Sequence, residues 1–216
     1  MKAVLFDAAG VLTAPFSFDL VAEAITSGAD VDTLVEVLLP IFSGEGADDD
    51  AVRVGNQLER GEVSLEDFLD SLGEARRDAA MVIDPHSPTF FGRYWSPNIA
   101  MAEFVHEVHE AGFLTGLVSN NVREWQDTWD RLVPTTLPFD VRLFSWQVGA
   151  RKPEPAIYER ALRGLDIAAT DALFIDDFAV MADGARSLGM TAIDFVDEES
   201  AIAEARQLLG LAPGVG

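Results

Sequence analysis

Four stretches of this 216-residue chain carry side chains that suit chemistry if the fold brings them together. Asp7 ends a run of apolar residues and is followed by small ones, and Ser119-Asn120 end a second apolar run. The acid pair Asp176-Asp177 ends a third such run. Lys152 is one of only two lysines in a chain that otherwise uses arginine. A carboxylate, a hydroxyl, an ammonium and an acid pair are the groups that phosphoryl transfer through an aspartyl phosphate requires.

Each group has a physical reason to take part. Adjacent carboxylates such as Asp176-Asp177 repel each other, and a divalent cation relieves the repulsion. The ammonium of Lys152 is a compact charge that suits a single phosphate or carboxylate. Taken singly, these residues are also ordinary helix caps, turn residues or surface charges. The case for a site therefore depends on the elements that position them.

Five short apolar runs, most of them bounded by Gly, Pro, Asn or Asp, predict the strands of a sheet. They span Lys2–Phe6, Phe113–Val118, Val141–Phe144, Ala172–Ile175 and Met190–Phe195. Helical patterns alternate with them at Ile99–Ala111, Pro155–Gly164, Ala179–Leu188 and Ser200–Leu209. This alternation predicts an α/β fold with a Rossmann-like parallel sheet and helices on both faces. The carboxyl ends of parallel strands share one edge, where the four chemical stretches would meet.

Residues 14–97 interrupt this alternation. They predict four amphipathic helices, at Phe18–Thr26, Val31–Phe42, Ala51–Arg60 and Ser64–Ala79. The last begins with a capping pattern, because Asp67 stands three residues after Ser64. We therefore expect a core domain of residues 1–13 and 98–216 and an inserted helical domain of residues 14–97.

Composition excludes several classes of protein. The chain has 37 acidic and 15 basic residues, a formal charge of -22, and no visible basic patch, which argues against nucleic-acid binding. It has no cysteine, so disulfides and cysteine-bound metals are excluded. No stretch has the length of a membrane span or of a signal peptide, so we expect no membrane association and a cytoplasmic location. Oligomeric state is not indicated.

The motifs together resemble those of the haloacid dehalogenase-like (HAD) hydrolase superfamily, in its helical-cap branch. Four segments occur in the family's order along nearly the whole chain. They are Phe6–Leu12, Val118–Asn121, Arg151–Tyr158 and Phe174–Asp177, the last followed by Gly184–Arg186. The insert matches the family's cap, and Glu59–Ser64 resembles a cap segment of one branch.

The resemblance implies a magnesium-dependent phosphatase that acts on a small phosphorylated metabolite. Asp7 would be the nucleophile. Asp7, the backbone carbonyl of Ala9 and the acid pair Asp176-Asp177 would form the Mg²⁺ site. Ser119, Asn120 and Lys152 would bind the transferred phosphoryl group, with Lys152 also acting in catalysis. The cap would close over the site to exclude water.

Two residues depart from the family's pattern. Phosphatases of the family commonly have a second Asp two residues after the nucleophile, as a general acid and base, whereas this chain has Ala9. Leaving groups that need little protonation, such as acyl or anomeric phosphates, would suffer least from this change. Met181 stands where related sequences often have Asn or Asp, which weakens the expected support of the metal loop.

Three other functions remain open at this stage. A metal-independent 2-haloacid dehalogenase needs no general acid, which fits Ala9, but it has no use for Asp176-Asp177 and needs an early cap arginine. Residues 3–52 contain neither Lys nor Arg. A signalling receiver domain uses similar groups in a different order. A catalytically degenerate protein of this fold would only bind a phosphorylated ligand or partner.

Other chemically capable side chains favour structural roles. His106 and His109 share a helix spacing that can bind a metal, but an exposed helix face is the expected position. The aromatic residues Phe90, Phe91, Tyr94 and Trp95 fall where the insert rejoins the core, and we expect them to pack there.

Overall fold

The computed structural model describes residues 1–14, 50–74, 77, 80–87, 90 and 95–212. All structural statements below concern these residues. The predicted helices at Phe18–Thr26 and Val31–Phe42 lie outside them, as do Phe91 and Tyr94 of the expected aromatic cluster.

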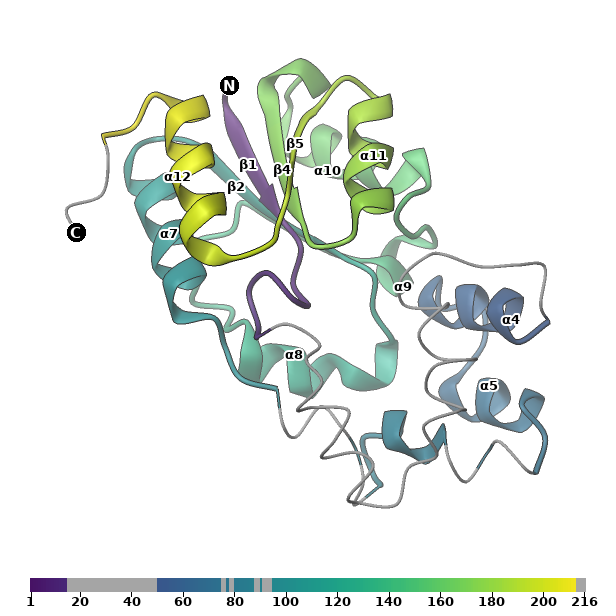
Figure 1. The fold of residues 1–216 in the computed structure, drawn as a ribbon. Helices are drawn as coiled ribbons and strands as arrows, with labels where there is room; N and C mark the ends of the chain where they lie inside the picture. Colours follow the sequence, from purple (N-terminus) through teal and green to yellow (C-terminus); the bar gives the residue numbers. More distant parts are fainter. Residues whose placement is uncertain (15–49, 75–76, 78–79, 88–89, 91–94, 213–216) are drawn as a thin grey trace.

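The described part of the chain is built on a five-stranded sheet in which every pair of neighbours is parallel (Figure 1). The strand order is β3-β2-β1-β4-β5, so β1 is central. The strands are β1 (Ala3–Phe6), β2 (Leu114–Ser119), β3 (Val141–Phe144), β4 (Ala172–Asp176) and β5 (Thr191–Asp194). All five predicted strands are confirmed, with ends that differ by at most one residue. The expected α/β fold is likewise confirmed.

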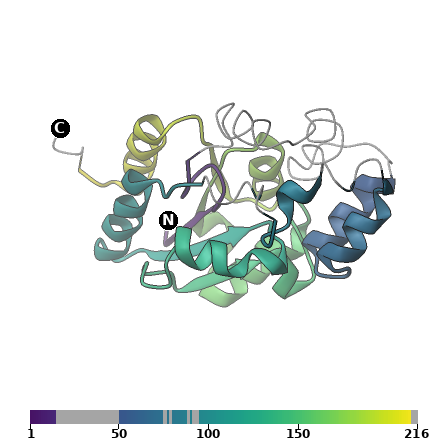
Figure 2. The same cartoon turned by 90° about the horizontal axis from the view of Figure 1, so that it is seen from below.

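Helices cover both faces of the sheet (Figures 1 and 2). One face carries α7 (Ile99–Glu110) and α12 (Glu198–Leu209), and the other carries α10 (Pro155–Leu165) and α11 (Ala179–Ser187). The starts of these helices follow local rules: the Asn98 side chain caps α7, and Pro155 opens α10 at a position where its missing N–H is not needed.

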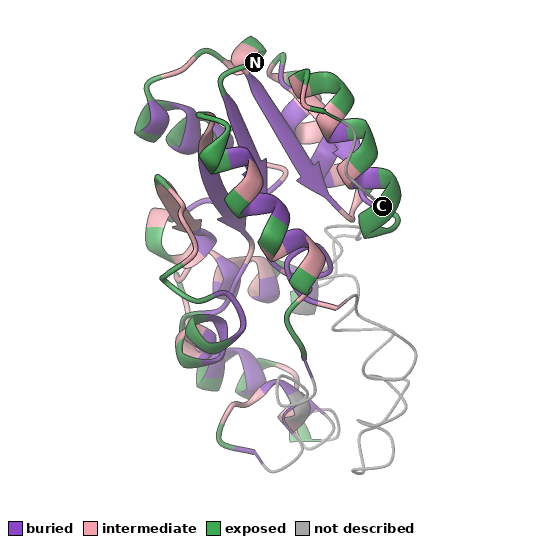
Figure 3. Ribbon diagram, turned by 90° about the vertical axis from the view of Figure 1, so that its left-hand side faces the viewer, coloured by how far each residue is buried: buried purple, intermediate pink, exposed green. Residues whose placement is uncertain are grey.

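The central strand divides the apolar core into two layers. Val4 and Phe6 pack with the α7 side, whereas Ala3 and Leu5 pack with the α10 side. Because successive strand residues point to opposite faces, a strand with both faces covered must be apolar throughout. Figure 3 shows the result, with the inner strands β1, β2 and β4 buried almost throughout and the helices exposed on their outer sides.

Two segments of the chain, residues 12–14 and 96–98, run side by side and antiparallel. Thr13 forms an antiparallel bridge with Pro97, the Ala14 N–H donates to the Ser96 carbonyl at 2.9 Å, and the Asn98 N–H donates to the Leu12 carbonyl at 2.9 Å. The chain thus leaves and rejoins the sheet domain through one pair of hydrogen-bonded segments.

Between these segments lie α4 (Asp50–Glu59) and α5 (Leu65–Ser71), shown in blue in Figure 1. The predicted capping box of α5 is confirmed, because Ser64 and Asp67 bond each other's backbone N–H. The predicted end of this helix is wrong: α5 ends at Ser71 and not at residue 79. Gly73 adopts a left-handed φ of 76°, which stops the helix.

Several short elements complete the described fold. They are η2 (Met81–Ile83), η4 (Arg123–Trp125), α8 (Gln126–Leu132), α9 (Ser145–Val148) and η5 (Ala169–Asp171). None of them was predicted as a separate element. Within the described residues no helix has the length and apolar character needed to cross a membrane.

Candidate active site

Asp7 follows the central strand at the carboxyl edge of the sheet. Its backbone N–H donates to the Ile175 carbonyl at 2.9 Å, so the β1–β4 ladder continues to this residue. Its Oδ1 accepts a hydrogen bond from the Ala8 N–H at 2.7 Å, and the residue is 6% exposed. The carboxylate is therefore held in one orientation, nearly out of water.

Lys152 lies against this carboxylate. Its Nζ is 2.8 Å from Asp7 Oδ1 and 2.5 Å from Asp176 Oδ2, and the residue is 1% exposed. Burial lowers the pKa of Lys152, but Asp176 and Asp7 raise it more, so the net pKa lies above its usual value. Lys152 is therefore a permanent cation between two strand-end carboxylates.

Asn120 contacts Lys152 through its side-chain amide. Its Oδ1 accepts from the Lys152 backbone N–H at 2.7 Å, and its Nδ2 donates to the Lys152 carbonyl at 3.0 Å. Ser119 is buried, and its Oγ donates to the Asn120 carbonyl at 3.2 Å. The Asn120 amide thus fixes the backbone of Lys152.

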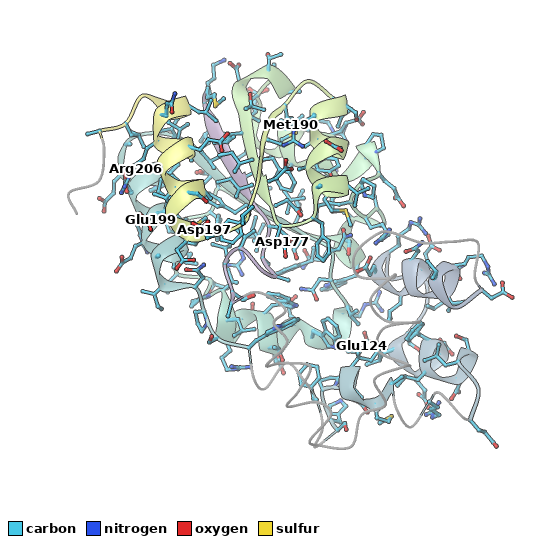
Figure 4. All side chains as sticks on the ribbon, viewed as in Figure 1. Glu124, Asp177, Met190, Asp197, Glu199 and Arg206 are labelled. Atoms are coloured by element: carbon cyan, nitrogen blue, oxygen red, sulfur yellow. The ribbon has the colours of Figure 1, made fainter. Side chains whose placement is uncertain are left out.

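Asp7, Asp176 and Asp177 form a cluster of acids whose ligand oxygens all lie within 4.8 Å of one another. Asp176 Oδ1 accepts from the Phe178 N–H at 2.9 Å, whereas Asp177 Oδ1 is buried without a hydrogen-bond partner. Figure 4 shows Asp177 at the edge of the sheet that faces Glu124, away from Met190 at the opposite end. A buried carboxylate oxygen with no donor suits a hard cation such as Mg²⁺, which prefers oxygen ligands.

Burial and the neighbouring negative charges raise the pKa values of two acids in this cluster. Burial, opposed in part by Lys152, raises the pKa of Asp176 to about 7. Burial and the charges of Asp7 and Asp176 raise the pKa of Asp177 to about 8. Without a metal, both carboxyls therefore hold protons at pH values well above the ordinary carboxyl range, because burial disfavours their charged forms.

This shift predicts how stability depends on pH in the presence of a chelator. Between the ordinary carboxyl pKa of 3.8 and values of about 7 to 8, the native state binds more protons than the unfolded chain. The free energy of unfolding should therefore fall as pH rises through this window and level off above it. Urea unfolding between about pH 5 and about pH 9 measures this. Stability that rises with pH across the window would contradict the assignment of these two carboxyls.

Gly10 brings the first loop into close contact with the acid pair. It has a left-handed φ of 79°, and a Cβ there would lie 2.1 Å from Asp177 Oδ2 and 2.6 Å from Asp177 Cγ. Only a residue without a side chain allows this approach. The small residues after Asp7 are thus required where Asp177 meets the loop.

We expect Gly10→Ala to destabilise the protein by about 1–3 kcal/mol and to weaken Mg²⁺ binding, because Asp177 must move. Gly210→Ala is the matched control, since Gly210 has a φ of 70° but nothing within 4 Å of its Cβ position. Thermal unfolding and Mg²⁺ titration of both variants measure the difference. Equal effects of the two substitutions would mean that only backbone strain matters at Gly10.

The region around Met181 is stabilised without the polar residue that related sequences have there. Met181 is buried, and its backbone carbonyl accepts from the Tyr158 hydroxyl at 2.7 Å. A Cβ at Gly184 would lie 2.8 Å from Pro153 Cβ and 2.9 Å from the Tyr158 hydroxyl, so α11 packs tightly on the segment that follows Lys152. The backbone and Tyr158 thus support the loop that carries the acid pair.

Other sequence candidates lie elsewhere. His106 and His109 are exposed on α7, and among the described residues the acid cluster at Asp7 is the only group of three or more potential metal ligands. Phe90 and Trp95 pack against Trp125, with ring centroids 6.0 and 6.1 Å apart. The packing role expected for these two aromatic residues is confirmed.

One buried acid near this site, Glu59, was not predicted as a functional residue. Glu59, the last residue of α4, pairs with Arg151, which precedes Lys152. Its place within the segment Glu59–Ser64 was the available signal, but the sequence does not show which part of the core that segment contacts.

Comparisons with known proteins place these observations in a family. A family model described as haloacid dehalogenase-like hydrolase matches residues 1–189. Acyl-CoA dehydrogenase family member 10 of Mus musculus is 26% identical over 215 residues, which are 97% of this chain and 19% of the relative. The chain thus spans about a fifth of the length of that relative. The sesquiterpene phosphatase astK of Aspergillus oryzae is 24% identical over 216 residues, with 97% of each chain covered.

Solved structures share the fold. A HAD family enzyme of Bacteroides thetaiotaomicron, in complex with magnesium and inorganic phosphate, superposes with a TM-score of 0.62. It is 18% identical in sequence, and the match covers 89% of this chain and 93% of that enzyme. At this identity the likeness establishes the fold and leaves the activity to be argued from the residues.

Proposed function

This chain belongs to the haloacid dehalogenase-like hydrolases, and we propose that it is a magnesium-dependent phosphatase that uses Asp7 as its nucleophile. Its substrate would be a small phosphorylated molecule. The relatives support the coarser part of this proposal, because one of them is a phosphatase and a neighbour of the same fold binds magnesium and phosphate. The finer part depends on the residues at the carboxyl edge of the sheet.

One observation carries the proposal. The Lys152 ammonium lies within 2.8 Å of Asp7 Oδ1, in a cluster of three carboxylates that includes an unpartnered oxygen of Asp177. A nucleophilic carboxylate beside a fixed cation and a candidate metal site matches what transfer of a phosphoryl group requires. A metal-independent dehalogenase would gain nothing from burying two further acids there.

In the first step, an oxygen of Asp7 attacks phosphorus and the bond from phosphorus to the leaving group breaks. This yields an aspartyl phosphate and an alkoxide or carboxylate product. Lys152, the Ser119 hydroxyl and the Asn120 backbone N–H hold the phosphoryl oxygens in the attack position. In the second step, water attacks phosphorus, inorganic phosphate leaves, and Asp7 is restored as a carboxylate.

The metal site would consist of Asp7, the Ala9 carbonyl, Asp176 and Asp177. Bound Mg²⁺ supplies positive charge that offsets the charge of the phosphoryl group and of the three acids. Asp176 contacts the Lys152 ammonium, so this candidate metal ligand also connects Lys152 to the metal site. Asp177, with its unpartnered oxygen, is the acid that gains most from the metal.

We further propose that residues 14–97 form a cap domain on a core of residues 1–13 and 98–216. The antiparallel bridge between Thr13 and Pro97 and its flanking hydrogen bonds support this boundary, because both passages between the two parts run there.

The function is tested by measuring phosphate release from a panel of phosphate esters and acyl phosphates, with Mg²⁺ and with a chelator. We expect turnover that requires the metal. Release that persists in the chelator would contradict the metal site. A complete lack of release, followed by metal-independent halide release from 2-haloacids, would replace the proposal with dehalogenation. Phosphate binding without turnover would indicate a degenerate binder.

The leaving group should decide the rate. With Ala9 in place of a general acid, we expect rates to fall steeply as the pKa of the leaving group rises, so that acyl phosphates react faster than alkyl phosphates. Ala9→Asp should raise the rate for alkyl phosphates by about 10- to 100-fold and flatten this dependence. Steady-state rates on a graded series of esters measure it. A flat dependence in the unmodified chain would show that another group donates the proton.

A further inference from the structure

Two ion pairs connect the end of α4 to the segment that carries Lys152. Glu59 Oε2 lies 2.5 Å from Arg151 Nε, and the two side chains are only 2% and 5% exposed. The next residue, Arg60, donates through Nε to Glu154 Oε1 at 2.9 Å. In the first pair the acid, Glu59, lies on α4, whereas in the second pair the acid, Glu154, lies on the segment that carries Lys152. The two pairs thus have opposite charge order, which opposes a shift of the end of α4 along the segment that carries Lys152.

The second pair also reaches the backbone beside Lys152. Glu154 Oε2 accepts a hydrogen bond from the Arg151 backbone N–H at 3.2 Å, and the Glu154 N–H donates to the Arg151 carbonyl at 2.8 Å. On the other side, Asn120 bonds the N–H and the carbonyl of Lys152. The Lys152 backbone is thus held from β2 by Asn120 and from α4 through its preceding residue.

Glu59 also belongs to the electrostatic network of the acid cluster. Burial raises the pKa of Glu59, Arg151 and then Lys152 lower it in part, and the negative charge of Asp7 raises it further. The net pKa is raised. The charges of Lys152 and Asp7 thus act on Glu59 in addition to the charge of its partner Arg151.

We propose that Glu59 is a positioning residue, whose buried ion pair with Arg151 fixes the segment from which Lys152 reaches Asp7 and Asp176. The catalytic consequence of this placement rests on the proposed phosphatase function. The placement itself does not, because the position of the Lys152 ammonium can be measured without substrate.

The physical argument concerns a buried guanidinium. If Glu59 loses its charge, the buried Arg151 guanidinium loses the carboxylate that contacts its Nε, and breaking a buried ion pair in this way favours a rearrangement of the segment that holds it. Arg151 and Lys152 are adjacent, so such a movement displaces the base of the lysine side chain. A displacement of about 1 Å in a reacting group can cost on the order of 100-fold in rate.

The chain offers a direct readout, because it has only two lysines. In protein labelled with ¹³C and ¹⁵N in lysine, the Cε–Nζ correlation spectrum contains one signal from Lys152 and one from the exposed Lys2. Lys2→Arg assigns the pair. We expect Glu59→Gln to move the Lys152 signal toward that of Lys2, as the ammonium leaves its two carboxylates, while the Lys2 signal stays in place.

Two further variants keep the test decisive. Arg60→Gln removes the second, half-exposed ion pair and should move the Lys152 signal in the same direction by a smaller amount, even if Glu59→Gln does not fold. Glu107→Gln is the control. It breaks the ion pair between α7 and Arg206 of α12, which lies on the opposite face of the sheet from α10, the helix that follows Lys152. An unmoved Lys152 signal in the folded Glu59→Gln protein, or in Arg60→Gln if the former does not fold, overturns the proposal.

A second readout separates this proposal from the phosphatase proposal. In calorimetric titrations with Mg²⁺ and inorganic phosphate, we expect Glu59→Gln to raise the Kd of phosphate at least about tenfold and Glu107→Gln to leave it unchanged. A moved Lys152 signal in a protein that hydrolyses no ester would support the positioning role and refute the phosphatase. An unmoved Lys152 signal in a protein that hydrolyses phosphate esters would refute the positioning role and support the phosphatase.

Discussion

We expect Asp7→Asn to abolish turnover, lowering the rate of phosphate release by on the order of 10⁴- to 10⁶-fold. The asparagine amide has nearly the same shape, and the contact between Lys152 and Asp176 does not involve residue 7. What is lost is the negatively charged oxygen that attacks phosphorus. The substitution also removes one of three mutually repelling acids, so we expect the variant to be folded.

Asp171→Asn is a suitable control for the loss of an acid, because Asp171 precedes β4 at the opposite end of the sheet and pairs with the exposed Lys2. Its turnover should equal that of the unmodified chain. Phosphate release by purified Asp7→Asn within about tenfold of the unmodified rate would remove Asp7 from the role of nucleophile.

Lys152→Met should have the largest effect on stability. The substitution leaves Asp7 and Asp176 buried without the cation that contacts both, and breaking a buried pair in this way costs about 3–5 kcal/mol. The loss should be greater at pH 8 than at pH 6, because the pKa of Asp176, about 7 even beside Lys152, rises further without the cation. Protonation then removes part of the repulsion at the lower pH. Urea unfolding at the two pH values measures it.

Lys2→Met provides the matched control, since Lys2 forms its ion pair with Asp171 on the surface and should contribute little. Mg²⁺ should recover part of the stability of Lys152→Met, because the metal replaces some of the missing positive charge. A Lys152→Met protein as stable as the unmodified chain at pH 8 would mean that the two carboxylates are neutral or solvated there.

Much of the fold follows from local pattern. Runs such as Ala3–Phe6 are apolar throughout because both faces of the sheet are covered, and their placement between helical patterns determines a parallel sheet. The positions of Asp7 and Asp176 at one edge follow from that topology. The sequence could therefore predict that the acids and the lysine lie together, with Ser119 at the end of the neighbouring strand.

What the sequence could not provide are contacts between distant side chains. Nothing near Asn120 indicates that its amide bonds the backbone of Lys152, 32 positions later. The pairing of Glu59 with Arg151 likewise depends on how α4 lies on the core, which no periodicity encodes. The early end of α5 was missed because the helical pattern continues past Gly73, where the backbone turns left-handed.

The central claim, that the phosphoryl group passes through Asp7, is tested most directly by trapping the covalent intermediate. The protein is mixed with a radiolabelled phosphate donor from the active members of the panel, quenched in acid within milliseconds, and digested. We predict Mg²⁺-dependent label on the peptide that contains Asp7, released by hydroxylamine as expected for an acyl phosphate. Metal-dependent turnover with no labelled protein, or with label on another residue, would contradict the account.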